Sequence, residues 1–204
     1  IPATLHDSLK ARLDRLQPIK EVAQTAACIG REFTHQLLAQ ICDLSDTELS
    51  SALEGLIASE LIQRRGQLPE ASYLLKHALV RDAAYESLLR GNRREIHSRI
   101  LSALETDADT APEVLAVHAE AAQLTDRAID LWETASKAAI ARPAFDEAIS
   151  HLRRAIALIT PALENSDNPP FERALTLIVP LSMTLLARKG FGADEPLESF
   201  KKAL

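Results

Sequence analysis

The chain has 204 residues, of which 47% are hydrophobic and 25% are charged, and its formal net charge is −6. This composition is typical of one large or two small globular domains, and the negative charge argues against a nucleic-acid partner. Ala and Leu dominate while aromatic residues make up 4%, which favours helix over strand. We find no signal peptide and no apolar run that could span a bilayer, so we expect a cytoplasmic protein without a membrane partner.

Capping residues and prolines predict four helices in the first third of the chain. The first follows Thr4, the second covers residues 19–29, and the third follows Thr34. The fourth covers residues 46–59, because Ser45 and Glu48 have the Ser-x-x-Glu form of a capping box.

Two short strands are predicted next, at residues 61–65 and 71–76, around a turn that contains Gly and Pro. The order of helix, turn, helix and hairpin is typical of a winged-helix domain. Helices at 77–89 and 93–104 would complete this domain, which we expect to cover residues 1–106.

Residues 73–89 have the sequence YLLKHALVRDAAYESLL, which predicts an exposed edge strand that turns directly into a helix. His77 lies at the joint between them, at or near the helix N-terminus. A helix start offers free N–H groups and the positive end of the helix dipole, so this joint is where a phosphate is expected.

A polar break at residues 106–112 precedes a second region that is helical throughout. Helices are predicted at 112–123, 126–141 and 145–159. A fourth is predicted at 171–189, with a kink at Pro180, and another begins at Pro196.

The second region also contains a degenerate match to a tetratricopeptide repeat, with Trp132 at the fourth position. The small or aliphatic positions of the repeat are then filled by Ser136, Ala148, Leu152 and Ala155. We therefore predict a mainly α chain, with tetratricopeptide-like helical hairpins over 112–204. An ordinary antiparallel bundle is the alternative, and we expect Trp132 to pack between helices rather than bind a ligand.

Sequence motifs for catalysis are absent. There is no phosphate-binding G-x-x-x-x-G-K-[ST] loop, no G-x-S-x-G, and no metal-ligand spacing among the six histidines. Cys28 and Cys42 have no second pair nearby and are interpreted as buried thiols. We therefore predict no catalytic residue, no metal site and no cofactor in this fragment, and we do not expect it to be an enzyme.

The helix at 46–59 would be the recognition helix of a DNA-binding winged-helix domain, but its negative charge is unfavourable for contact with DNA. It carries Asp46, Glu48 and Glu54 and no Lys or Arg, whereas a helix in the major groove needs cations for phosphates. DNA binding is thus the less favoured interpretation.

The 73–89 stretch, with RREIH at 93–97, resembles signalling ATPases of the STAND class. The opening residues 1–16 and the IGREF sequence at 29–33 are similar to the same family. In large bacterial proteins of this kind, a class III adenylate/guanylate cyclase or transcription-regulator domain precedes the ATPase, and tetratricopeptide-like repeats follow it. The resemblance covers nearly all of the chain.

The resemblance implies a role for His77. In plant resistance proteins of the wider class, the His of a Met-His-Asp motif is held to contact the β-phosphate of ADP. His77 matches this His, whereas Lys76 replaces Met and Ala78 replaces Asp. His77 is therefore a candidate ADP sensor in the full-length protein, with Lys76 as a weaker candidate, and packing at a helix start is an equal alternative. Tyr85 and His97 also match and are interpreted as structural.

Three functions follow as expectations. The favoured one is a non-catalytic region for regulation, coupling and protein–protein interaction in a larger nucleotide-switched signal-transduction protein. The resemblance implies ATP or ADP with Mg in that parent, an upstream nucleotide-binding domain as partner, and a protein or peptide at the repeats. The alternatives are a DNA-binding winged-helix transcription regulator and a helical-repeat scaffold without nucleotide linkage.

Overall fold

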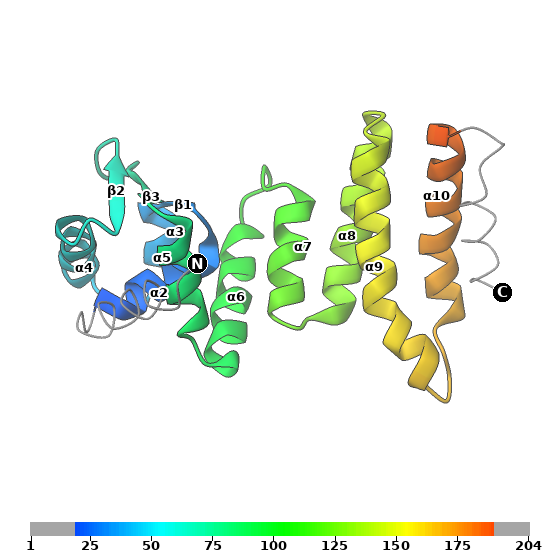
Figure 1. The fold of residues 1–204 in the computed structure, drawn as a ribbon, viewed down its shortest axis with the longest axis horizontal. Coiled ribbons are helices and arrows are strands. Elements are labelled where there is room, and N and C mark those ends of the chain that lie inside the picture. The colour runs from blue at the N-terminus through cyan, green and yellow to red at the C-terminus, as the bar shows by residue number, and fades with distance from the viewer. Residues whose placement is uncertain (1–18, 190–204) are drawn as a thin grey trace. The chain divides into compact units, whose positions relative to one another are not determined.

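The computed structural model describes residues 19–189, which divide between Asp107 and Ala108 into two compact units. The first, residues 19–107, is called the sheet-containing unit, and the second, residues 108–189, the helical unit. These residues are mainly helical and contain one small antiparallel sheet of three strands (Figure 1). The helices predicted after Thr4 and from Pro196 lie outside the described residues. None of the described helices is long and apolar enough to cross a membrane.

The sheet-containing unit alternates helices with three short strands. Its sheet has the order β1-β3-β2, so that β3 is the central strand. The elements are α2 (Ile19–Ile29), β1 (Glu32–Thr34), α3 (His35–Ile41), α4 (Asp46–Ala58), β2 (Ile62–Arg65), β3 (Ser72–Leu75), α5 (Ala78–Glu86) and α6 (Arg90–Leu104).

The capping box predicted for α4 is confirmed. The backbone N–H of Glu48 donates to Ser45 Oγ at 3.4 Å, and the backbone N–H of Ser45 donates to Glu48 Oε2 at 2.9 Å. These reciprocal bonds satisfy donors that a helix start leaves open and fix the first residue of α4.

The predicted hairpin is present as β2 and β3, but the expectation that residues 73–75 form an edge strand is wrong. Strand β1, which was not predicted, pairs with the other side of β3 and places Phe33 opposite Tyr73. The two rings stack with their centroids 5.6 Å apart. Tyr73 is 3% exposed and Leu75 is 1% exposed, because the central strand turns these side chains into the core.

The opposite face of the sheet carries polar side chains around the half-buried Leu74. Arg65 on β2 and Ser72 on β3 both approach Glu32 on β1, at 3.7 Å and 3.4 Å respectively. The sheet is therefore amphipathic, with one face in the core and one in solvent.

Helix α5 begins one residue after its predicted start and ends three residues before its predicted end, whereas α6 begins three residues early and ends at residue 104 as predicted. The two helices are joined by polar contacts. Arg93 donates to the backbone carbonyl of Tyr85 at 3.0 Å, and its guanidinium lies over the Tyr85 ring, 4.2 Å from the centroid. The hydroxyl of Tyr85 is 3.2 Å from Nε2 of buried His97. A cation at the C-terminal carbonyls of α5 is favourable for the helix dipole.

In the helical unit, four helices pack in sequence order, each against the next. They are α7 (Pro112–Ala121), α8 (Thr125–Ala141), α9 (Phe145–Asn165) and α10 (Phe171–Lys189). The predicted bounds of α10 are confirmed, and the helix continues through Pro180, where the kink stays a prediction. The predicted end of α9 at residue 159 is wrong. The helix runs on through Pro161, which lies on its exposed side, and Asn165 donates to the Pro161 carbonyl at 2.9 Å.

Trp132 packs between three helices of this unit, as expected. Its ring on α8 stacks on His151 of α9 at 5.2 Å, and its Nε1 donates to Glu120 of α7 at 3.2 Å. Arg154 of α9 lies over the ring, 4.8 Å from the centroid. The side chain is 2% exposed, so little of it is left for a ligand.

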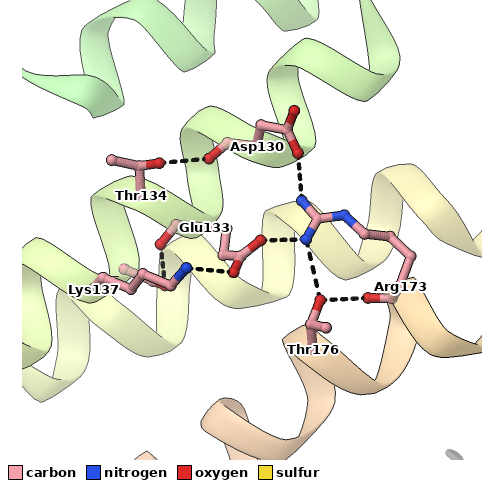
Figure 2. A network of polar contacts seen from close by, with 7 residues as sticks. Asp130, Glu133, Thr134, Lys137, Arg173 and Thr176 are labelled. Atoms are coloured by element: carbon pink, nitrogen blue, oxygen red, sulfur yellow. Dashed lines mark hydrogen bonds and ion pairs between the residues drawn. The ribbon is translucent and has the colours of Figure 1, made fainter.

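Arg173 connects α10 to α8, two helices back along the chain. Figure 2 shows its guanidinium between Glu133 and Asp130, and its Nη2 donates to Asp130 Oδ1 at 2.6 Å. Lys137 approaches the other oxygen of Glu133 at 2.6 Å. Burial raises the pKa of Glu133, but the hydrogen bonds and positive charges of Lys137 and Arg173 outweigh it. The net effect is a pKa below the ordinary value.

Candidate functional site

The joint between β3 and α5 is the site that the sequence singled out. Leu75 ends the central strand, and His77 is the residue that precedes α5, with φ −133° and ψ 136°. Its carbonyl accepts from the backbone N–H of Val80 at 3.0 Å and of Arg81 at 3.4 Å. Its side chain makes no capping bond, so the N–H groups at the start of α5 have no side-chain acceptor from this position.

The backbone of the joint is fixed, while its side chains face solvent. Leu75 donates its N–H to the Arg31 carbonyl at 2.9 Å, and Lys76 donates to the Leu61 carbonyl at 3.1 Å. The side chains of Lys76 and His77 are exposed, as is Ala78. An imidazole buried inside the fold would have excluded contact with another domain, and His77 is not buried.

The electrostatics of the joint favour an anion. The first turn of α5 contains no acidic residue. A phosphate held there would therefore be attracted by the open N–H groups, by the positive end of the helix dipole and by the ammonium of Lys76. Asp82 lies further along α5 and is already paired with Arg81 at 3.0 Å.

The two cysteine thiols are unsuited to nucleophilic catalysis. Cys28 and Cys42 are free thiols. Burial raises the pKa of Cys28 to about 12, and the opposing effect of Arg93 is smaller. Burial also raises the pKa of Cys42. Both thiols are thus protonated at neutral pH and poor nucleophiles. Among residues 19–189, no group of three His, Cys, Asp or Glu side chains could hold a metal ion.

Helix α4 presents its acidic residues to solvent. Asp46, Glu48 and Glu54 are all exposed, so the negative charge predicted for this helix lies on the surface. Phosphates of nucleic acid would be repelled by it.

Arg64 was not singled out from the sequence; the basic residues of the hairpin fit either a solvated face or a contact with an acidic partner surface. In the structure, Arg64 and Lys76 line one surface depression between α4 and β2. No local sequence signal could have shown this, because the two residues meet only through the pairing of β2 with β3.

Comparison with known proteins gives one distant relative. The chain is 30% identical over 201 residues to the uncharacterized protein R02095 of Rhizobium meliloti. The match covers 96% of this chain and 19% of that protein, so the chain spans about a fifth of the length of the relative. No protein-family model matches the chain, and no solved structure matches it significantly.

Proposed function

We propose that this chain is the regulatory and coupling region of a larger STAND-type signalling protein, built from a winged-helix domain and tetratricopeptide-like helices. The winged-helix domain closes on an upstream nucleotide-binding domain when ADP is bound, and His77 contacts the phosphate. The helical unit binds a protein or peptide and biases this closure. The single observation that carries the proposal is the exposed His77 at the start of α5, directly after the central strand.

The topology of the sheet-containing unit supports the winged-helix part of the proposal. From α2 to β3 the order is helix, strand, helix, helix, strand, strand. The sheet order β1-β3-β2 places the first strand beside the last, as in winged-helix domains. The hairpin of β2 and β3 then corresponds to the wing.

The packing of α8 against α9 supports the repeat part. The four positions that the repeat pattern assigns to small or aliphatic residues are all buried, with exposed fractions of 0–1%. They are Ser136, Ala148, Leu152 and Ala155. Small side chains at such positions let two helices approach closely, and a series of such hairpins gives a stacked array with an extended surface.

The contacts of α5 support a role in coupling. Its N-terminal end carries the joint, and its C-terminal end is held to α6 through Arg93 and to α2 through Ser87, which accepts a hydrogen bond from Gln24 at 2.8 Å. A displacement at His77 would therefore be passed to two other helices rather than absorbed in a loop.

Two experiments test the proposal. In calorimetry, the isolated chain is expected to show no heat of binding with ATP, because it lacks a phosphate-binding loop. Micromolar affinity of the chain alone would contradict the assignment of nucleotide binding to another domain.

The second experiment uses the full-length protein that contains this chain. His77→Ala is expected to weaken ADP binding about tenfold, the effect of losing one charge-assisted hydrogen bond to phosphate. His35→Ala is the matched control, because His35 also lies at the start of a helix, α3. Equal ADP affinity in the wild type and both variants would remove His77 from the nucleotide site. A gel shift with the isolated chain, abolished by salt, would instead favour the DNA-binding alternative.

A further inference from the structure

A surface depression runs between the C-terminal half of α4 and strand β2. Three consecutive residues of β2 line it, namely Ile62, Gln63 and Arg64. The other lining residues are Glu54, Ile57, Ala58 and Lys76.

The depression opens at the outer edge of β2 rather than on one face of the sheet. Successive side chains of a strand point to opposite faces, and here Ile62 is buried in the core while Gln63 is exposed. Because residues that point to both faces of β2 line this hollow, we place it along the side of the strand. Because the sheet order is β1-β3-β2, no strand of the described part of the chain lies on this side of β2.

The register shows which backbone groups face this edge. Lys76 donates its N–H to the Leu61 carbonyl at 3.1 Å, so that the pair is a hydrogen-bonded one. Antiparallel pairs alternate, so Gln63 and Arg65 also direct their N–H and C=O groups at β3. The corresponding groups of Ile62 and Arg64 point outward, in the pattern that an added strand uses.

The lining has an apolar floor and an excess of positive charge. Ile57 and Ala58 supply apolar surface from α4. In the part of the chain that the structure describes, neither Arg64 nor Lys76 forms an ion pair with a carboxylate, whereas the adjacent Arg65 is paired with Glu32. Glu54 is the single acidic residue of the lining.

We propose that this depression binds an extended acidic segment of a partner protein, which adds as a strand to the outer edge of β2. The backbone of Ile62 and Arg64 supplies the hydrogen bonds, and the side chains of Arg64 and Lys76 select carboxylates. A second copy of the chain fits less well, because pairing two β2 edges brings like charges together. This inference does not depend on nucleotide binding at His77.

The test begins with a library of random linear peptides displayed on phage and selected on the 204-residue chain. Enriched peptides are expected to be acidic and rich in β-branched residues. One of them is then synthesised and titrated by calorimetry into three proteins, the wild type, Arg64→Glu and Arg65→Glu. Both variants change the charge equally and are checked by circular dichroism, but only Arg64 lines the depression.

Arg64→Glu is expected to weaken binding about tenfold or more, and Arg65→Glu about twofold or less. Arg64→Pro should also abolish binding without breaking the pairing to β3, because it removes an N–H that points outward. In NMR spectra, the amides of Ile62 and Arg64 should show the largest shifts. Equal affinity of the two Glu variants, failure to enrich any peptide, or a dimer that Arg64→Pro dissociates would each overturn the proposal.

Discussion

The two units of the chain differ in how far along the sequence their stabilising contacts reach. In the sheet-containing unit, Glu32 and Ser72 meet across 40 residues, Asp43 and Arg99 across 56, and Gln24 and Ser87 across 63. In the helical unit, each helix packs chiefly on the one before it and the one after it, and the contact of Arg173 with Asp130 across 43 residues is an exception.

This difference suggests different mechanical roles. Contacts between segments that are distant in sequence break cooperatively when the unit unfolds. The joint at His77 therefore lies in a unit that is either folded or unfolded as a whole. A stack of neighbours can open from an end, because its stability is a sum over adjacent pairs. A rigid frame suits a sensor, and an adjustable stack suits a surface that binds a partner.

The largest expected effect comes from opening a cavity in one unit at a time. Leu56 and Leu152 are both 0% exposed, in α4 and α9 respectively. Each Leu→Ala change should cost about 3 kcal/mol of unfolding free energy in its own unit. Trp132 is the single tryptophan and lies in the helical unit. Its fluorescence transition in urea should therefore shift more in Leu152→Ala than in Leu56→Ala. Equal shifts would show that the two units unfold as one.

The next effect is a pH dependence in the helical unit. Burial lowers the pKa of His118 to about 4 from an ordinary 6.5, and the residue is 5% exposed. Between these values the unfolded chain binds more protons than the folded one, so the folded unit loses stability as the pH falls through this window. The stability curve of His118→Gln, followed by Trp132 fluorescence, should be flatter over the same window. Parallel curves would contradict the assignment.

A smaller effect is expected at the ion pairs of Figure 2. Arg173→Gln removes one of the two cationic partners of Glu133, whose side chain is 14% exposed, and should cost about 1 kcal/mol. Arg142 pairs with Glu147 where both side chains are more than half exposed. Arg142→Gln should therefore change the stability by less than about 0.5 kcal/mol. Urea titrations compare the two, and equal costs would indicate that Arg173 contributes no more than a surface charge.

The smallest effect distinguishes two buried serines. Ser136 donates to the Glu133 carbonyl at 2.7 Å, whereas the hydroxyl of Ser182 has no hydrogen-bond partner among residues 19–189. Ser136→Ala should lower the stability by about 1 kcal/mol, and Ser182→Ala should leave it unchanged or raise it slightly. A clear loss in Ser182→Ala would mean that its hydroxyl has an acceptor in solution.

Local chemistry was enough to predict much of this fold. The capping box fixes the start of α4, and the apolar spacing identifies α8, α9 and α10. The wrong predictions concern residues whose secondary structure depends on pairing with segments distant in sequence. Three residues of β1 carry no strand signal, and they form a strand because Ser72–Leu75 lies beside them. For the same reason Tyr73 was placed on an edge when it is central.

The position of the candidate site could be predicted from the sequence, but its exposure to solvent and its neighbouring side chains could not. The helical spacing after Ala78 placed His77 at a helix start, which is correct. Its exposure depends on the pairing of β3 with both neighbours and could not be read locally. The same pairing brings Arg64 next to Lys76, so the depression beside β2 was missed.

The most direct test of the central claim is hydrogen exchange of the full-length protein with and without ADP. If the joint closes on the nucleotide-binding domain, the amides from Lys76 to Arg81 should exchange more slowly when ADP is bound. Those of α3, which begins at His35 far from the joint in sequence, should be unchanged. Identical exchange at the joint in both states would contradict the proposed switch.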